Sequence, residues 1–346
     1  MIALTGGGTG GHLEIARLLK EAFRAQGIAP IFVGSTHGQD RRWFGEDEGF
    51  VARYFLNTRG VVDRGPAGRI VSLAMIARAT PTAAGILKRH AVRAVVNVGS
   101  YAAAPASFAA AWRRIPLFIH ENGAKVSPLS RLLRPSAAGF FSSYGEDSPV
   151  TDFPVDRAFF DTARPRTRVE GILFLGGSQG STFINDFALA AAPTLQGLGI
   201  AIAHQTGETD FDRVRARYRA LRIAADVFAF DRVMAPRMAT ADLAVSRSGG
   251  GTLWQLAANG LPTLFVPFPY AARDHQYENA RFLVDRRVAF VARQTELHVG
   301  LLLSVLQADL RAISVGLMAL VKPGGAEQIA EYVLSQLDRQ GQGDRR

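Results

Sequence analysis

Two glycine-rich turns, about half a chain apart, constrain the fold of this sequence most strongly. One occupies residues 6–11 and the other residues 176–180, and each follows a short apolar run typical of a buried parallel strand. A glycine turn between a strand and a helix lets backbone N–H groups converge at the helix N-terminus, where phosphate or a developing oxyanion is stabilised. The two turns therefore predict two facing α/β halves of the nucleotide-binding kind, and a phosphorylated substrate.

The chain is long enough for two domains, because its 346 residues exceed the size of one comfortable hydrophobic core. Strand-like runs alternate with helix-like stretches, which is typical of parallel α/β sheets. One series of predicted strands covers residues 1–5, 30–34, 51–56, 92–98, 116–120 and 138–142, and a second covers 171–175, 200–205, 225–230, 243–246, 263–266 and 288–292. Residues 148–168 are rich in proline and charge, so we expect the interdomain linker near 155–168.

The two ends and the residue usage bear on the cellular compartment. Met1 leads straight into a strand instead of a charged, cleavable leader, and no run of about 18 or more apolar residues argues for a spanning helix. We therefore expect a cytoplasmic protein. The sequence has no cysteine, which excludes disulfides, thiolate metal sites and a cysteine nucleophile. Residues 324–337 are predicted to form a last amphipathic helix, and residues 338–346 are expected to fray.

The formal charge of +10 calls for an anionic partner. Nucleic acid is disfavoured, because the sequence contains no zinc finger, helix-turn-helix signature or ribonucleoprotein motif. An anionic membrane surface fits, since each basic residue near such a surface contributes about 1 kcal/mol. An arginine-rich but merely solvated surface is the alternative.

The first glycine turn has the spacing Gly6-x-Gly8-x-x-Gly11 of a dinucleotide fingerprint. No acidic residue ends the second predicted strand to bind ribose hydroxyls, and no Gly-Lys-Ser/Thr follows as in a P-loop ATPase. His12 comes directly after the last glycine, where an imidazole can act as a general base near neutral pH. A structural histidine is the alternative.

Seven motifs together carry a family resemblance. They are Gly7-Gly8-Thr9-Gly10-Gly11-His12, Gly99-Ser100-Tyr101, His120-Glu121-Asn122, Gly176-Gly177-Ser178-Gln179-Gly180 with Asn185, His204-Gln205-Thr206-Gly207, Ser246-Arg247-Ser248-Gly249, and Asp274-His275-Gln276 with Asn279-Ala280. In order and spacing the chain resembles the MurG family over nearly its whole length. Members of that family are bacterial UDP-N-acetylglucosamine transferases that convert lipid I to lipid II in peptidoglycan synthesis, and so serve cell-wall biogenesis, cell shape and cell division.

The resemblance implies a GT-B architecture, in which two Rossmann-like parallel-sheet domains face a central cleft. Residues 1–157 would form the acceptor-binding, membrane-associated domain and residues 158–322 the UDP-sugar domain. Residues 323–346 would form a helix that packs back on the first domain and ends in a frayed tail. The implied reaction is inverting transfer of N-acetylglucosamine from UDP-N-acetylglucosamine to the 4-hydroxyl of lipid I. A GT-B transferase for another UDP-sugar or lipid acceptor, or a non-catalytic nucleotide-sugar-binding protein, are the alternatives.

By the same resemblance, the catalytic residues would be His12, Thr9 and Glu121. His12 would take the proton from the acceptor hydroxyl, and the two glycine turns would stabilise the departing UDP diphosphate. Ser178, Gln179 and Asn185 would touch the diphosphate or uridine, Phe230 and Met234 the uracil, and His275 and Gln276 the donor sugar. The full set of implied substrate contacts is Gly10, Gly11, Tyr101, Asn122, Gly177, Ser178, Gln179, Asn185, Phe230, Asp231, Met234, Arg247, Gly249, Thr252, Gln255, His275 and Gln276.

No cofactor and no obligatory protein-bound metal are expected. Asp210-Phe211-Asp212 is similar to the metal-binding pair of other transferases, but it lies in a helix-like stretch with Arg213 and Arg215. A solvated face is therefore favoured over a metal site as the interpretation of this pair.

Two of the implied roles have structural alternatives. His120 and Glu121 end a predicted buried strand, and they are explained equally well as a satisfied hydrogen-bonded pair. Arg247 is explained either as a charge-assisted contact to the donor or as a structural ion pair.

The chain also departs from the family pattern at several positions. Gln255 stands where a glutamate normally holds the ribose hydroxyls, so the charge assistance is lost. The other departures are Asn122-Gly123 in place of glutamine and asparagine, Ser100 in place of glycine, Asp156 in place of arginine with Arg157 next to it, and Asp231 in place of an apolar residue.

Membrane contact has its own sequence signals. Residues 70–78 and 86–89 form an apolar stretch flanked by cations, as in an interfacial helix, and Phe108, Trp112, Arg113 and Arg114 add an aromatic and basic cluster. A core helix with snorkelling arginines is the alternative. We expect a peripheral protein at the cytoplasmic face of the inner (plasma) membrane. Its partners would be UDP-N-acetylglucosamine, lipid I, an anionic membrane surface and other cell-wall synthesis proteins, without nucleic acid.

Overall fold

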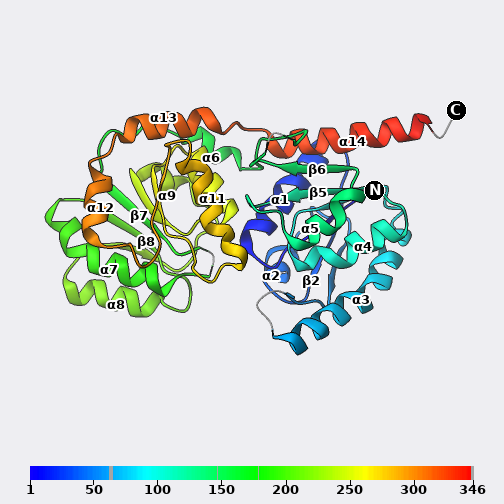
Figure 1. The fold of residues 1–346 in the computed structure, drawn as a ribbon, viewed down its shortest axis with the longest axis horizontal. Helices are drawn as coiled ribbons and strands as arrows, with labels where there is room; N and C mark the ends of the chain where they lie inside the picture. The colour runs from blue at the N-terminus through cyan, green and yellow to red at the C-terminus, as the bar shows by residue number, and fades with distance from the viewer. Residues whose placement is uncertain (62–64, 146, 178, 344–346) are drawn as a thin grey trace. The chain divides into compact units, whose positions relative to one another are not determined.

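The structure is a computed structural model that describes residues 1–61, 65–145, 147–177 and 179–343 (Figure 1). The chain divides into two compact units, Met1–Pro154 with Gly324–Arg346, and Val155–Pro323. The sequence was expected to divide after residues 157 and 322.

The first unit contains a six-stranded parallel sheet in the order β3-β2-β1-β4-β5-β6. Its strands are β1 (Ile2–Thr5), β2 (Ile31–Ser35), β3 (Arg53–Leu56), β4 (Ala94–Asn97), β5 (Leu117–Glu121) and β6 (Gly139–Ser142). Its helices are α1 (Gly10–Ala25), α2 (Asp40–Phe44), α3 (Pro66–Arg89), α4 (Ala104–Trp112), α5 (Pro128–Leu133) and α14 (Gly325–Gly343), with short 3-10 turns η1 (Tyr101–Ala103) and η2 (Arg134–Ser136).

The second unit repeats this topology, with a parallel sheet in the order β12-β11-β10-β7-β8-β9. Its strands are β7 (Gly171–Leu175), β8 (Ala201–Gln205), β9 (Asp226–Phe228), β10 (Leu243–Ser246), β11 (Thr263–Phe265) and β12 (Phe290–Val291). Its helices are α6 (Arg157–Asp161), α7 (Thr182–Gly197), α8 (Phe211–Leu221), α9 (Ala235–Thr240), α10 (Gly250–Ala258), α11 (His275–Val284), α12 (Val299–Leu306) and α13 (Leu310–Leu320), with the turn η3 (Ala272–Asp274).

Each glycine turn follows the first strand of its sheet. The next strands in the chain are added on one side of that strand and the later ones on its other side. In the first sheet β1 lies between β2 and β4, and in the second β7 lies between β8 and β10. Ligands of such sheets bind at this switch point, beyond the carboxyl ends of the strands. All twelve strands predicted from the sequence are present, with ends that differ from the predicted ones by at most two residues, and the predicted α/β fold of two parallel sheets is confirmed.

The prediction that residues 155–168 form an interdomain linker is wrong, because these residues pack within the second unit. They include α6, and the side chain of Arg166 is fully buried. Its guanidinium donates to the carbonyl oxygens of Met238 and Asn259, near the ends of α9 and α10. Carbonyl groups at a helix C-terminus stabilise a cation. This explains why Arg166, in a proline-rich segment, can be buried.

The C-terminal helix is longer than the sequence suggested. Residues 338–343, which were expected to fray, continue the helix. α14 extends to Gly343 and packs against α1 in the first unit. Tyr332 on α14 makes edge contacts with Phe118 and Phe141. Because this packed part nucleates the helix, further turns add one hydrogen bond per residue and do not need apolar side chains.

The sequence made a spanning helix unlikely, and two stretches of the structure bear on that expectation. Among the described residues, α3 is long and apolar enough to span a membrane by length and composition. The helices over residues 299–306 and 310–339 meet the same criterion only if they count as one span, although they are bent by 81° at the break between them. Core helices of soluble proteins pass the same test, and 39% of the apolar window of α3 is buried in the protein. Ala83, Ile86 and Leu87 of α3 belong to the core of the first unit.

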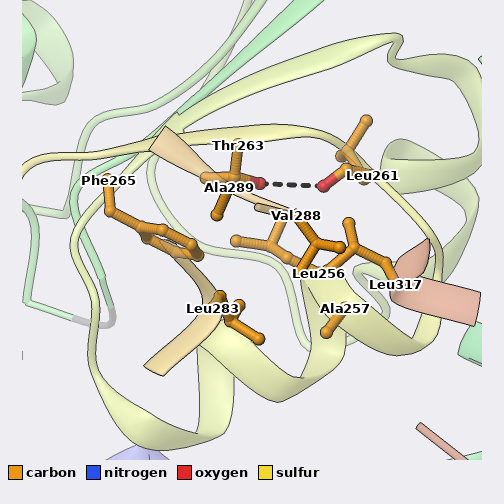
Figure 2. A pocket seen from close by; sticks show the side chains of 9 residues that line it. All are labelled: Leu256, Ala257, Leu261, Thr263, Phe265, Leu283, Val288, Ala289 and Leu317. Atoms are coloured by element: carbon orange, nitrogen blue, oxygen red, sulfur yellow. Dashed lines mark hydrogen bonds between the residues drawn. The ribbon is translucent and has the colours of Figure 1, made fainter. Parts of the chain in front are cut away.

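A small apolar cavity lies in the second unit beside α10, α11 and β11 (Figure 2). The hydroxyl of Thr263 donates to the carbonyl oxygen of Leu261 at 2.9 Å, so this polar side chain is already satisfied. The remaining lining is aliphatic or aromatic: Leu256, Ala257, Leu261, Phe265, Leu283, Val288, Ala289 and Leu317. The cavity is therefore a gap in packing that offers nothing to orient a polar substrate.

Candidate active site

The first glycine turn owes its shape to glycines and to one aspartate. Gly6, Gly7 and Gly8 have φ values of +141°, +146° and +77°, which L side chains rarely adopt. A Cβ built on Gly7 would overlap the carboxylate of Asp40. That carboxylate accepts hydrogen bonds from the backbone N–H of Gly8 and, at 2.7 Å, of Ser35.

Asp40 is fully buried at the start of α2. Burial raises the pKa of its carboxyl, and the N–H groups of Ser35 and Gly8 oppose that rise. The acidic residue that is missing from the end of β2 thus lies five positions further along and reaches back into the turn. Because it occupies the Gly8 N–H, the turn does not offer that group to a phosphate.

His12 lies at the first turn of α1, which begins at Gly10 and Gly11. Its Nδ1 is 2.9 Å from the hydroxyl of Thr9. A Cβ on Gly99 would lie 2.7 Å from the imidazole Cδ2, so only glycine at that position leaves room for the ring. To act as a general base through Nε2, the imidazole must be in the tautomer whose Nε2 carries no proton. Nδ1 then carries the proton and donates a hydrogen bond to the Thr9 hydroxyl.

Ser100 and Tyr101 follow Gly99 at the edge of the same turn. Ser100 has φ +76° and ψ 166°, a region that is almost confined to glycine, which explains the glycine usual here in the resembled family. The Tyr101 hydroxyl donates to the carbonyl oxygen of His37 at 3.2 Å, and its ring lies against Gly8. Tyr101 therefore closes one side of the glycine turn.

His120, Glu121 and Asn122 stand at the end of β5. Glu121 accepts from the backbone N–H of Ser127 at 2.9 Å, and burial raises the pKa of its carboxyl. His120 is buried against Phe153, and burial, followed by the charge of His12, lowers its pKa to about 3. The alternative in which His120 and Glu121 bond to each other is therefore wrong. Within the described chain, His120 Nδ1 and Asn122 Oδ1 are buried without a hydrogen-bond partner.

The second glycine turn leads into α7. Gly177 and Gly180 have φ values of +85° and +79°, and Gly180 N–H bonds to the Gly177 carbonyl at 3.0 Å. Ser181 caps α7, and its hydroxyl accepts from the N–H of Ile184. Gln179 is exposed, and Ser178 lies outside the described residues.

Arg247 lies behind this turn, directly after β10, and its guanidinium is held by oxygen atoms. Nη1 donates to the carbonyls of Val266 and Pro267 at 2.9 and 3.0 Å, and Nη2 donates to Ser181 Oγ at 2.7 Å. Burial lowers its pKa to about 10. It forms no ion pair with a carboxylate of the described residues, so the structural ion-pair alternative is wrong. A buried, uncompensated cation beside two helix N-termini favours an anion.

Two further helices begin at the same edge of the second sheet. α10 has Gly249 as its N-cap, Thr252 in its first turn and Gln255 one turn later. α11 begins with His275 and Gln276, and Gln276 Oε1 accepts the N–H of Phe268 at 2.9 Å. The predicted diphosphate, ribose and sugar contacts thus come from helix starts that follow adjacent strands.

Phe230, Asp231 and Met234 lie in the loop between β9 and α9. Asp231 accepts from the N–H of Val233 at 2.9 Å and from Arg237 Nε at 2.7 Å. Hydrogen bonding to Arg237 and Val233 outweighs desolvation and lowers the pKa of the Asp231 carboxyl. Asp231 is therefore committed to shaping the loop, which carries the predicted uracil contacts at its two ends.

Asn185 and the Asp210–Asp212 pair are also engaged within the protein. Asn185 is fully buried and bonds to Thr206, Asp210 and His204. Asp210 and Asp212 form ion pairs with Arg213 and Arg215 at 2.8 Å, and of the two carboxylates only that of Asp212 is well exposed. No cluster of three or more His, Cys, Asp or Glu side chains in the described part of the chain could hold a metal ion.

The predicted residues thus form two groups, one at the switch point of each sheet. Sequence reasoning missed Asp40, Ser181 and the bonds that commit Asn185 and Asp231. Only Ser181 carried a local signal, because a serine before an apolar helical run is a typical N-cap.

Comparisons with known proteins give the same division of the chain. Residues 2–138 match the glycosyltransferase family 28 N-terminal domain, and residues 171–315 match the glycosyltransferase family 28 C-terminal domain.

Similar proteins cover nearly the whole chain. A UDP-N-acetylglucosamine--N-acetylmuramyl-(pentapeptide) pyrophosphoryl-undecaprenol N-acetylglucosamine transferase of Wolinella succinogenes is 50% identical over 96% of this chain and 99% of that protein. One of Sulfurovum sp. with the same name is 47% identical, over 96% and 98%. The Acinetobacter baumannii MurG crystal structure has a TM-score of 0.77 at 24% identity and covers 96% of this chain and 99% of that one. The likeness in fold confirms the predicted GT-B class.

Proposed function

We propose that this chain, which belongs to the family of UDP-N-acetylglucosamine--N-acetylmuramyl-(pentapeptide) pyrophosphoryl-undecaprenol N-acetylglucosamine transferases, makes lipid II from lipid I. It transfers N-acetylglucosamine from UDP-N-acetylglucosamine to the 4-hydroxyl of the lipid-linked N-acetylmuramyl pentapeptide, with inversion at the anomeric carbon. The observation that carries the proposal is the high identity to curated relatives across the full length of both chains. The product serves peptidoglycan synthesis, and through it cell shape and division.

The second unit holds the donor. The N-termini of α7 and α10 and the buried Arg247 stabilise the diphosphate, and they do so most strongly when UDP departs with its extra negative charge. Gln255 accepts a ribose hydroxyl, His275 and Gln276 bind the sugar, and the loop between β9 and α9 holds the uracil. Ser178 and Gln179 complete the phosphate contacts.

The first unit holds the acceptor and the base. His12, oriented by Thr9, takes the proton from the 4-hydroxyl while the oxygen attacks the anomeric carbon and the bond to the diphosphate breaks. Glu121, Asn122 and Tyr101 orient the acceptor. Support comes from Asn122 Oδ1, whose buried acceptor has no partner among the described residues.

The first unit also binds the cytoplasmic face of an anionic membrane. Support comes from α3, where Ile70 is 69% exposed and Val71 and Leu73 are exposed beside Arg69 and Arg78, while the second half of the helix buries only the face that carries Ala83 and Leu87. α3 packs on α4, whose last residue Trp112 is 68% exposed. Exposed apolar residues flanked by cations fit a helix that lies at the bilayer surface.

A UDP-release assay tests this function against its alternatives. The purified chain is given UDP-N-acetylglucosamine, UDP-glucose or UDP-N-acetylgalactosamine, each with and without a short-chain lipid I. We expect rapid UDP release only with UDP-N-acetylglucosamine and lipid I together. Equal release with another UDP-sugar would indicate a different donor, and UDP binding without release would indicate a binding protein.

A further inference from the structure

The segment His204-Gln205-Thr206-Gly207, for which the proposed function uses no side chain, lies under the second glycine turn. A Cβ built on Gly180 would overlap the carbonyl oxygen of Thr206, and one on Gly207 would lie 2.6 Å from the Gly180 Cα. The two backbones therefore touch with no space for a side chain between them. Residues 206–207 form the floor of the turn.

This floor is bonded on both sides. Thr206 N–H and Gly207 N–H donate to the carbonyls of Phe228 and Ala229 at 2.9 and 3.0 Å, at the start of the loop that carries Phe230. On the other side, the Thr206 carbonyl accepts from Asn185 Nδ2 at 3.0 Å. Any shift of Asn185 therefore moves the floor relative to the glycine turn.

His204 fixes the orientation of Asn185. The Asn185 amide nitrogen donates to Thr206 and, at 2.8 Å, to Asp210 Oδ2, so its oxygen faces His204 Nε2 at 3.0 Å. An amide oxygen only accepts, so Nε2 carries a proton. On a neutral imidazole Nδ1 is then an acceptor, and it receives the Tyr218 hydroxyl at 3.1 Å. His204 is fully buried, and burial lowers its pKa to about 3, which keeps the imidazole neutral, while its two hydrogen-bond partners select the tautomer.

We propose that His204 is a positioning residue for the donor diphosphate, acting through Asn185 on the floor beneath the second glycine turn. The Asn185 oxygen selects the tautomer with the proton on Nε2, the Tyr218 hydroxyl donates to Nδ1 and supports it, and the Nε2–H in turn holds the Asn185 amide in place. This inference rests on the proposed function, because it assumes that the glycine turn receives the diphosphate of the UDP-sugar.

Two substitutions of His204 separate the roles of its nitrogens. His204→Gln places an amide nitrogen near the Nε2 position, where it still donates to Asn185. His204→Asn reaches only the Nδ1 position and leaves the Asn185 oxygen without its donor. Because an unsatisfied buried acceptor weakens the arrangement, we expect UDP to bind His204→Asn about tenfold more weakly and His204→Gln nearly as well as the wild type.

The matched control is His90→Asn. His90 also bonds to a tyrosine, since its Nε2 lies 2.7 Å from the Tyr54 hydroxyl, but it belongs to the first unit. This variant should leave UDP affinity unchanged. Should His204→Asn fail to fold, Tyr218→Phe removes only the hydroxyl that donates to His204 Nδ1, and it should weaken UDP binding by about threefold.

Steady-state kinetics distinguish positioning from a loss of folded protein. We expect His204→Asn to raise the KM for the UDP-sugar while the KM for the acceptor stays the same. A lower kcat with an unchanged donor KM, or equal UDP affinity in the wild type and His204→Asn, would overturn the positioning role. Absence of UDP binding by the wild type would instead refute the proposed function.

Discussion

At the scale of single residues, the proposed chemistry depends on which nitrogen of the His12 imidazole carries the proton. Thr9 and His12 lie 2.9 Å apart, and the base requires that the proton be on Nδ1 and be donated to the Thr9 hydroxyl. The carboxylate of Asp40 holds the preceding turn, and Gly99 leaves space for the ring. These neighbours restrict where His12 can lie without contacting the substrate themselves.

The first prediction is that His12→Ala lowers kcat by about 10²-fold or more, which is typical for the loss of a general base. UDP affinity should hardly change, because the donor contacts come from the second unit. Steady-state transfer and calorimetry with UDP measure the two quantities. Turnover close to that of the wild type would remove His12 from the catalytic role.

A second prediction concerns Gln255, which is half-buried on α10. Gln255→Glu should tighten UDP binding by about 1 kcal/mol, because a carboxylate makes a stronger hydrogen bond to a ribose hydroxyl than an amide does. Calorimetry provides the check, with Gln307→Glu, at an exposed position of the second unit after α12, as a control for added charge. Unchanged or weaker binding would mean that another residue holds the ribose.

Residues of the site could be predicted from the sequence where a pattern of neighbouring residues is enough to identify them. Glycines in a strand-to-helix turn and the histidine after them mark the site without any tertiary information. Asp40 was not predictable, because its role depends on the return of the chain from β2 to the glycine turn. The commitment of Asn185 to His204 likewise depends on the packing of α7 against β8.

At the scale of elements, the two halves of α3 differ in how their apolar side chains are exposed. Its first half exposes Ile70, Val71 and Leu73, and its second half supplies Ala83 and Leu87 to the core. The core-helix interpretation is therefore confirmed for one face of the second half, and the interfacial-helix interpretation of the first half stays a prediction.

The third prediction is that replacing Arg69, Arg78, Lys88 and Arg89 by glutamine abolishes sedimentation with anionic vesicles. Charge attraction to the surface is screened over about 8 Å at physiological ionic strength, so wild-type binding should also weaken with added salt. Transfer to a short-chain soluble acceptor should stay intact.

A matched control replaces Arg215, Arg217, Arg219 and Arg222, which lie on or beside α8 in the second unit, and removes the same charge. This variant should sediment like the wild type. Full sedimentation of the α3 variant would mean that its cations are merely solvated and that the membrane surface lies elsewhere.

Strands were easier to predict than the elements around them. A strand buried on both faces is an uninterrupted apolar run, so its sequence is distinctive. α6 was hidden in a segment whose prolines and charges suggested a linker, and it forms because Asp156 caps it and Phe159 is buried. The length of α14 depends on its packing against α1, and no pattern within the sequence of α14 itself indicates that contact.

At the scale of the whole molecule, each unit buries one neutral histidine next to its sheet. Burial lowers the pKa of both His120 and His204 from 6.5 to about 3. Above pH 6.5 both are neutral in the folded and the unfolded chain. Below it the unfolded chain takes up protons that the folded chain refuses, so folding stability is lost as the pH falls towards 3.

The fourth prediction is that the free energy of unfolding of each unit falls by about 1.4 kcal/mol per pH unit well below pH 6.5, from its histidine alone. Urea unfolding at pH 7, 6 and 5 measures the slope. In His204→Gln the contribution of that histidine should vanish, so the second unit should lose less stability on acidification than in the wild type. An unchanged slope in this variant would contradict the assignment of His204 as a buried neutral group.

The most direct test of the whole account is the structure of the product. The purified chain is incubated with UDP-N-acetylglucosamine and a short-chain lipid I, and the linkage of the new disaccharide is determined by mass spectrometry and NMR. Attack by the acceptor 4-hydroxyl on the α-linked donor predicts a β-configured N-acetylglucosamine on that oxygen, with one UDP released per disaccharide. An α-linked product, another attachment site, or UDP release without transfer would contradict the account.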